Sequence, residues 1–201
     1  MAQSPRCTAF TVWRRGSKLP GRKEKMIDAR HYRAEEALRD GRKVVIRSVT
    51  PEDKAAMLEA YHGLDPATLY MRFFAPRREP TARELRDWTE VDFVSTIRLV
   101  ACIAADDGDE RIIGGASSFR LAGAEAASAE ISFTIEEDFQ GQGLAGRLLQ
   151  HLAHIARTLG VRRFIAEMLP ANQAMLAVFE RSGLPMERRR VAGVVHVRLE
   201  L

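Results

Sequence analysis

A glycine-rich turn lies between an alternating strand and a long amphipathic helix, and this junction constrains the fold more than any other feature of the chain. Over residues 130–136 polar and apolar residues alternate strictly, which predicts a strand with one polar and one buried face. Residues 141–146 then contain three glycines. Over residues 144–159 leucine and isoleucine recur every three or four positions, which predicts a helix with one apolar side. The glycines therefore stand at a helix start, where free amides and the helix dipole favour a bound phosphate.

The turn fits two nucleotide signatures. Residues 141–146 read GQGLAG, the GxGxxG spacing of a Rossmann dinucleotide site, and residues 140–145 read QGQGLA, the QxxGxA spacing of a coenzyme A site. A Rossmann site needs a buried strand that runs directly into the first glycine and several further βα units. Here the strand is half polar, and only 55 residues follow Gly146. The Rossmann interpretation is therefore disfavoured. The turn is still expected to hold a diphosphate, and a tight turn without a ligand is the alternative.

Helix and strand signals alternate along the rest of the chain. The apolar runs at 98–104 and 111–120 are joined by an acidic turn and predict an antiparallel hairpin. The prediction is an α/β (α+β) fold with a mixed, mostly antiparallel twisted sheet of six to seven strands flanked by helices. Further strands are expected at residues 44–49, 161–168 and 191–199, and further helices at residues 31–40, 50–63, 65–74, 81–87 and 172–182.

The positive charge of the chain is concentrated in an N-terminal arm. Residues 1–25 hold seven Arg and Lys residues and one Glu, whereas the whole chain has a net charge of +4, so the remainder is slightly acidic. The sequence pI of 9.4 is thus poor evidence for nucleic-acid binding by the fold itself. We expect residues 1–40 to form a basic, flexible arm with a short helix, residues 41–201 to form one domain, and Met26 to be an alternative start.

Composition also bears on the compartment and on metal binding. No apolar run reaches the roughly 18 residues of a membrane span, and the N-terminus lacks the apolar centre of a secretory signal. Cys7 and Cys102 are not part of a CxxC motif, so a reduced, soluble, cytoplasmic protein without a membrane partner is expected. His151 and His154 share one helix, but no third ligand is evident and we expect no metal site.

The order of elements and two motifs resemble the GNAT superfamily of acetyl-CoA-dependent N-acetyltransferases over about residues 42–200. The motifs are QGQGLA at 140–145 and Asn172-Gln173-Ala174 with a later Gly183-Leu184, which looks like the family's NxxA…GF helix. The resemblance implies the GNAT fold, acetyl-CoA as cofactor, the turn amides on its pyrophosphate and strand backbone along its pantetheine arm. The cofactor-binding residues that it implies are Phe133, Thr134, Ile135, Gln140, Gly141, Gln142, Gly143, Leu144, Ala145, Gly146, Asn172 and Phe179.

A narrower resemblance concerns the acceptor side. Residues 69–74 read LYMRFF, similar to the YxRFF segment of bacterial protein lysine acetyltransferases of the Pat type, and Ala129-Glu130 is similar to the start of their fourth strand. This resemblance implies Glu130 as general base. A carboxylate suits the role because an amine with a pKa near 10.4 is mostly protonated at neutral pH. A solvated charge is the other interpretation of Glu130. The alternative bases are Glu136 and Glu137, and the expected acceptor-binding residues are Tyr70, Arg72 and Phe73.

One position departs from the family pattern. Many GNAT enzymes carry a tyrosine seven residues after the asparagine, where it protonates the departing thiolate, but this chain has Phe179 there. A thiol with a pKa near 8.5 can leave without full protonation, so activity is still expected. The resulting expectation is acetyl transfer to an amine, with a protein lysine as favoured acceptor. A small amine acceptor or a catalytically weak acyl-CoA sensor module is the alternative, and the chain is expected to be a monomer or a homodimer.

Overall fold

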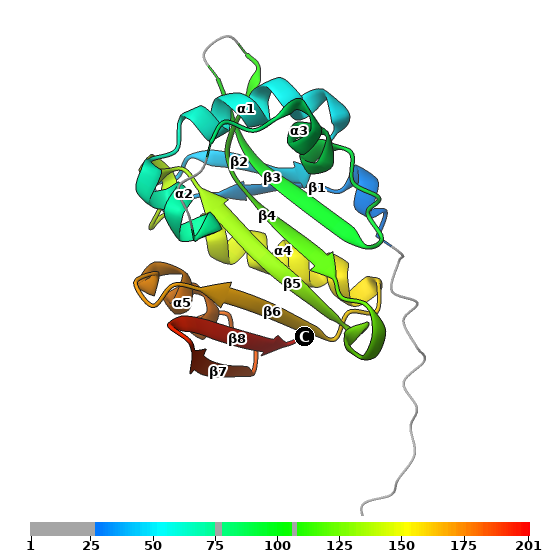
Figure 1. Ribbon diagram of the computed structural model, residues 1–201. Helices are drawn as coiled ribbons and strands as arrows, with labels where there is room; N and C mark the ends of the chain where they lie inside the picture. Colours follow the sequence, from blue (N-terminus) through cyan, green and yellow to red (C-terminus); the bar gives the residue numbers. More distant parts are fainter. Residues whose placement is uncertain (1–26, 75–77, 106–107) are drawn as a thin grey trace, which may run out of the picture.

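The computed structural model describes residues 27–74, 78–105 and 108–201 (Figure 1). Within these residues eight strands form one sheet in the order β1-β2-β3-β4-β5-β6-β8-β7. Every neighbouring pair is antiparallel except β5 with β6, which is parallel. The strands are β1 Arg33–Ala37, β2 Lys43–Ser48, β3 Thr96–Ala104, β4 Glu110–Arg120, β5 Ser128–Ile135, β6 Arg163–Met168, β7 Met186–Val191 and β8 Val194–Glu200. The mixed, mostly antiparallel sheet is confirmed.

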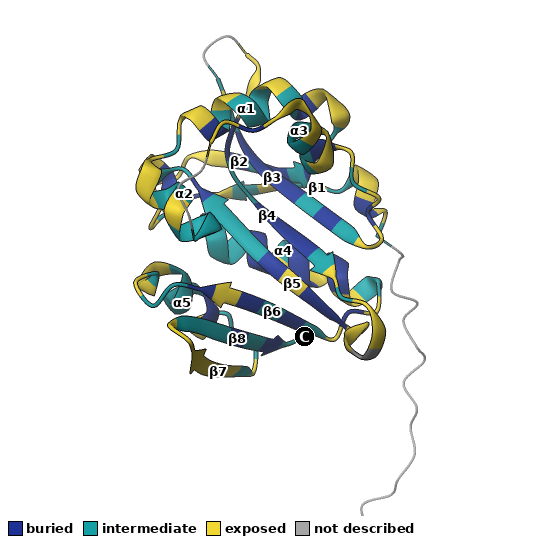
Figure 2. Cartoon of the chain, viewed as in Figure 1, coloured by how far each residue is buried: buried dark blue, intermediate teal, exposed yellow. Residues whose placement is uncertain are grey.

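Helices cover both faces of the sheet. The helices are α1 Lys54–His62, α2 Pro66–Phe73, α3 Ala82–Thr89, α4 Leu144–Thr158 and α5 Gln173–Glu180. Figure 1 shows α1 and α3 together on one side of the sheet and α4 behind it. Leu148, Leu152 and Ile155 of α4 are fully buried, which confirms the predicted apolar stripe. Figure 2 shows this buried layer continuing through the central strands. None of the helices in the described residues is long and apolar enough to span a membrane.

The predicted helix starts lie close to their signals. Thr81 is the N-cap of α3: its hydroxyl accepts from the Glu84 N–H at 3.2 Å, and its own N–H donates to the Glu84 carboxylate at 2.9 Å. The turn that precedes α1 begins at Thr50 with Pro51 in its first position. These local signals fix where α1 and α3 begin, and α1 packs on β4 and on α3.

The helix predicted at residues 31–40 is wrong. A 3₁₀ turn, Ala29–His31, is followed by β1, which pairs with β2 from Arg33↔Arg47 to Ala37↔Lys43. Arginine, alanine and glutamate favour helix locally, but pairing with β2 outweighs this propensity. Gly41 has φ +90° and belongs to the turn between the two strands. The predicted domain boundary at residue 41 therefore falls between two paired strands.

Both strands that the sequence prediction missed are edge strands. β1 and β7 lie at the two ends of the sheet, so the count is eight and not six to seven. Their side chains are largely exposed, and all but the first residue of β7 are exposed. An edge strand without a buried face lacks the alternation that reveals a strand in sequence. The basic arm at residues 1–25 and the alternative start at Met26 lie outside the described residues.

Candidate active site

Strands β5 and β6 part along their length and leave a gap in the sheet. They pair only from Ser128↔Arg163 to Glu130↔Ile165. Beyond Glu130, β5 continues to Ile135, and none of the described strands lies beside it on that edge; Figure 1 shows β5 and β6 diverging. The Glu136 N–H donates to the Ile113 carbonyl of β4 at 3.0 Å. Because backbone groups alternate in direction, the N–H groups of Phe133 and Ile135 point into the gap.

The glycine-rich turn lies at the open end of this gap and leads into α4. Gly141 has φ +72°, and Gly143, the N-cap of α4, has φ +86°. The side chain of any other residue would strain this left-handed backbone, although a Cβ would meet no atom at close range. The first helical bond runs from the Arg147 N–H to the Gly143 carbonyl at 3.2 Å. The three amides between them, including that of Leu144, therefore lack a helical acceptor and suit an anion.

Arg39 adds a positive charge beside the turn. Its guanidinium donates to the Gly141 carbonyl at 3.0 Å and its backbone N–H to the Gln142 carbonyl at 3.2 Å. Arg39 is a site residue that was not predicted from the sequence, because it lies just after β1, in the segment whose sequence favours a helix. The glycine-rich turn that Arg39 contacts lies about 100 residues later in the sequence, so no local pattern could have revealed the contact.

The gap forms part of a groove of 520 Å³ between β5, β6, α4 and α5. Arg72 of α2 also lines the groove, as does Ser132, which was not predicted. Gln142, Phe73 and Tyr70 do not line it: the Gln142 carbonyl is held by Arg39, Phe73 lines a second cavity, and Tyr70 is 46% exposed. The predicted cofactor residues that line it, together with Glu130, are Phe133, Thr134, Ile135, Gln140, Gly141, Gly143, Leu144, Ala145, Gly146, Asn172 and Phe179.

Glu130 lies where β5 and β6 begin to part. It is exposed to solvent and lines the groove. Within residues 27–74, 78–105 and 108–201 its carboxylate has no hydrogen bond or ion pair, so it is available to a ligand. The two alternative bases are engaged: Glu136 forms an ion pair with Arg111, and Glu137 accepts from the Asp65 N–H at 3.2 Å. Of these three carboxylates, Glu130 has the geometry of a base that must accept a proton from an incoming group.

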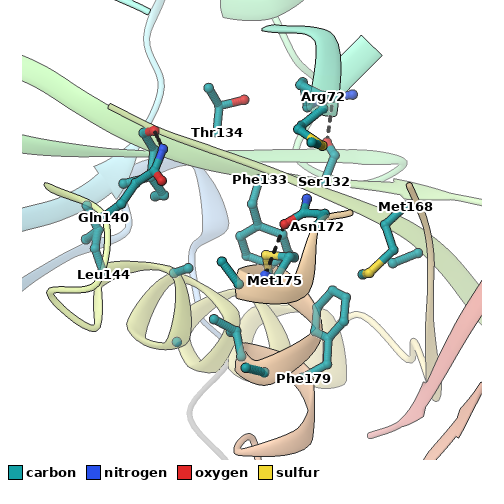
Figure 3. A pocket seen from close by; sticks show the side chains of 18 of the residues that line it. Arg72, Ser132, Phe133, Thr134, Gln140, Leu144, Met168, Asn172, Met175 and Phe179 are labelled. Carbon is teal, nitrogen blue, oxygen red and sulfur yellow. Dashed lines mark hydrogen bonds between the residues drawn. The ribbon is translucent and has the colours of Figure 1, made fainter. Parts of the chain in front are cut away.

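Alternation along β5 divides its side chains between the two faces. The Phe133 ring packs edge-on against Phe179 of α5, with ring centroids 6.2 Å apart. On the opposite face the Ser132 hydroxyl accepts from Arg72 of α2 at 2.8 Å (Figure 3). Glu130 is two residues from Ser132 and therefore lies on the same face as Arg72. The groove is thus apolar towards α5 and polar towards α2.

Asn172 and Phe179 come from the same element. The Asn172 carboxamide oxygen accepts from the Met175 N–H at 3.1 Å and caps α5, as drawn in Figure 3. Phe179 is 1% exposed and offers only the surface of its ring to the groove. Asn172 therefore fixes α5, and Phe179 shapes the groove without any group that can transfer a proton.

The two helix histidines serve other contacts. The His151 ring is 2.5 Å from the Tyr32 hydroxyl and 3.0 Å from the Glu36 carboxylate, and His154 is exposed. Glu36 also pairs with Arg147, so these groups tie β1 to α4. In the part of the chain that the structure describes, no three potential metal ligands come together.

Comparisons with known proteins agree with this geometry. Residues 43–185 match the family model described as an acetyltransferase (GNAT) domain. A Pseudomonas aeruginosa protein named as an acetyltransferase is 34% identical over 140 residues, which cover 70% of this chain and 74% of that protein. Acetyltransferase Pat of Mycolicibacterium smegmatis is 31% identical over 170 residues, 82% of this chain but 47% of that protein. The crystal structure of the GNAT domain of S. lividans PAT has a TM-score of 0.76 at 34% identity and covers 84% of this chain and 97% of its own.

Proposed function

The chain belongs to the GNAT acetyltransferase family, whose members use acetyl-CoA, and on that premise we propose that it acetylates a protein lysine with Glu130 as general base. The observation that carries the proposal is the parting of β5 and β6 directly after Glu130. One groove then connects this carboxylate, which has no partner among the described residues, to the start of α4, where unpaired amides suit an anion.

In this proposal the donor lies along the gap. The unpaired amides at the start of α4 and the guanidinium of Arg39 hold the pyrophosphate. The N–H groups of Phe133 and Ile135 face the gap and offer hydrogen bonds to an extended arm and to the thioester oxygen. Ile135 lies five positions after Glu130 along β5, a distance of about 17 Å at the usual rise per residue of a strand. An extended arm held at α4 can therefore bring its reactive end close to Glu130.

The proton balance explains why a carboxylate is needed there. At neutral pH a lysine amine is an ammonium ion and has no free electron pair. Glu130 takes one proton, and the neutral amine nitrogen then bonds to the thioester carbon. The carbon–sulfur bond breaks to release the thiolate, and the second proton that the nitrogen loses passes to the thiolate or to water. The exposure of Glu130 and the absence of a protein partner within the described residues leave room for the acceptor amine. The resemblance of residues 69–74 to Pat-type enzymes supports a protein lysine as that amine.

The test measures release of the coenzyme A thiol from acetyl-CoA in the presence of lysine-containing proteins and peptides. Glu130→Gln should lower kcat by 10²- to 10⁴-fold, the usual contribution of a general base, with an unchanged acetyl-CoA Kd. Glu35→Gln is the matched control because Glu35 is an exposed strand glutamate on β1, away from the groove. Retention of more than a tenth of the rate by Glu130→Gln would remove Glu130 from the role. Acetyl-CoA binding without thiol release from any amine would favour a sensor module.

A further inference from the structure

A second cavity adjoins the groove on the α1–α3 face of the sheet. It has a volume of 200 Å³ and lies between the helices and strands β3, β4 and β5. Arg72, Ser132 and Thr134 line both this cavity and the groove. Tyr61 and Trp88 contribute aromatic walls. The cavity thus opens beside the reaction centre on the face that carries Glu130, the side from which an acceptor would approach.

Arg98 lines this cavity half-buried, and no described residue bonds to its guanidinium. It is paired with Ser117 of β4, and Ser117 is paired with Ser132 of β5, so the three residues form one row on the cavity face. The Arg98 Nε is buried and has no hydrogen-bond partner. Among residues 27–74, 78–105 and 108–201, no carboxylate pairs with this guanidinium, and its ring contact is Phe119, at 5.9 Å. A buried guanidinium nitrogen without a hydrogen-bond partner is costly, so this arginine calls for an explanation.

The surroundings of Arg98 favour an anion. Burial, together with the nearby charge of Arg72, lowers the pKa of Arg98 to about 10, which still leaves it protonated at neutral pH. Glu136 also lines the cavity, but it is held by Arg111 outside the cavity lining. The charge that the described residues present to the cavity is therefore positive. Aromatic walls limit water and strengthen the attraction for an anion that enters.

We propose that this cavity binds a carboxylate carried by the acceptor and that Arg98 is the residue that pairs with it. The inference rests on the proposed function, since it assigns the acceptor's chemistry at that same site. The planar guanidinium suits a two-bonded pair with a carboxylate. Arg98 and Glu130 stand two strands and two residues apart, about 12 Å between Cα atoms at the usual spacings. An amine and a carboxylate separated by several bonds can span that distance.

Two sources of the carboxylate share this chemistry. One is the α-carboxylate of a free amino acid such as lysine, and the other is an acidic side chain beside the acceptor lysine of a peptide. The test therefore uses two matched pairs of acceptors with acetyl-CoA: free lysine against 1,5-diaminopentane, and a Lys-Glu peptide against the same peptide with Lys-Gln. The first pair tests the free amino acid and the second tests the peptide.

We expect at least a tenfold lower KM for the carboxylate member of one pair in the wild-type protein. Arg98→Met should abolish this preference, so that the KM values of the two members of the pair become equal within two-fold. Arg98→Lys, which keeps the charge, should retain part of the preference. Arg157→Met is the control, because Arg157 is an exposed arginine near the end of α4. Equal KM values within both pairs, or a preference that survives Arg98→Met, would overturn the assignment.

A binding measurement separates this inference from the proposed function. Hexanoate carries a carboxylate but no amine, so it should raise the melting temperature of the wild-type protein and not that of Arg98→Met. If hexanoate stabilises the protein but no thiol is released, the carboxylate site is supported and the acetyl transfer is refuted. If thiol is released but neither acceptor pair is discriminated and hexanoate does not stabilise the protein, the acetyl transfer is supported and the carboxylate site is refuted. Arg98→Met should fold, because methionine keeps the apolar stem of the side chain and removes a charge that has no partner among the described residues.

Discussion

Gly143→Ala tests the backbone of the proposed pyrophosphate site. Gly143 caps α4 with φ +86°, and a Cβ there would find its nearest atom outside the turn, an Arg39 side-chain nitrogen, at 3.6 Å. The cost is therefore torsional and not a clash. A left-handed backbone costs an L-residue about 1–2 kcal/mol. Alanine also reduces the freedom of the unfolded chain, which offsets less than about 1 kcal/mol of this. The net penalty is about 1 kcal/mol in the conformation that presents the helix amides.

This penalty can be divided between folding and binding. If the free protein keeps the turn, the whole penalty lowers the free energy of unfolding and the acetyl-CoA Kd is unchanged. If the turn relaxes in the free protein, the penalty returns on binding and raises the Kd by up to about five-fold. The sum of the two changes should equal about 1 kcal/mol in either case, because the bound conformation is the same.

Gly193→Ala is the matched control for this prediction. Gly193 has φ +84° and open space around its Cα, but it lies in the turn between β7 and β8, away from the groove. Its penalty should appear in the unfolding free energy alone. Urea denaturation gives the first quantity and calorimetric titration with acetyl-CoA the second. For Gly143→Ala, the loss of unfolding free energy and the loss of binding free energy are added together. If this sum is below about 0.3 kcal/mol while Gly193→Ala is destabilised, the left-handed backbone at Gly143 does not carry the expected penalty.

Two further predictions concern the ion pair between Arg47 and Asp53 and the departing thiolate of coenzyme A. Burial alone would raise the pKa of Asp53, but bonds from Arg47 and the Thr50 N–H outweigh it and hold the pKa below 3.8. The pair therefore stabilises the fold above that pH, and this contribution is lost as the pH falls through the depressed value. Asp53→Asn should lower the free energy of unfolding by about 3 kcal/mol at pH 7, and this free energy should then fall less steeply as the pH is lowered, as measured by urea denaturation. An equally steep fall at acid pH in the variant and the wild type would contradict this. Phe179→Tyr should raise kcat below about pH 8.5, where the leaving thiolate gains from a proton donor, and leave it unchanged above; a pH-independent effect would exclude proton donation.

The strand–turn–helix junction could be predicted because its signals are local. Alternation at residues 130–136, glycines at 141–146 and leucines at 144–159 each occupy one short window. The structure has β5, the turn and α4 within a few residues of these windows. The glycines that carry positive φ also follow from sequence, since only glycine adopts this backbone without cost.

The parts that sequence could not reveal depend on strand register. Arg98, Ser117 and Ser132 form one row only because three strands pair in a particular alignment, and a shift of one residue would put them on the other face. Arg39 reaches the turn because β1 pairs with β2, against the helical propensity of its own segment. Edge strands and cross-strand rows are set by partners far along the chain, so the acceptor side of the site appears only in the folded protein.

The alternation of β5 also divides the work of the site. Its odd-numbered residues face α4 and α5, where Phe133 meets Phe179 and the donor groove is apolar. Its even-numbered residues face α2, where Ser132 meets Arg72 and Glu130 has no partner among the residues that the structure describes. In the proposed mechanism the donor lies on one side of β5 and the acceptor amine on the other, and the two meet at the edge of the gap. A strand paired along both edges would keep them apart, so the proposal depends on the parting of β5 from β6.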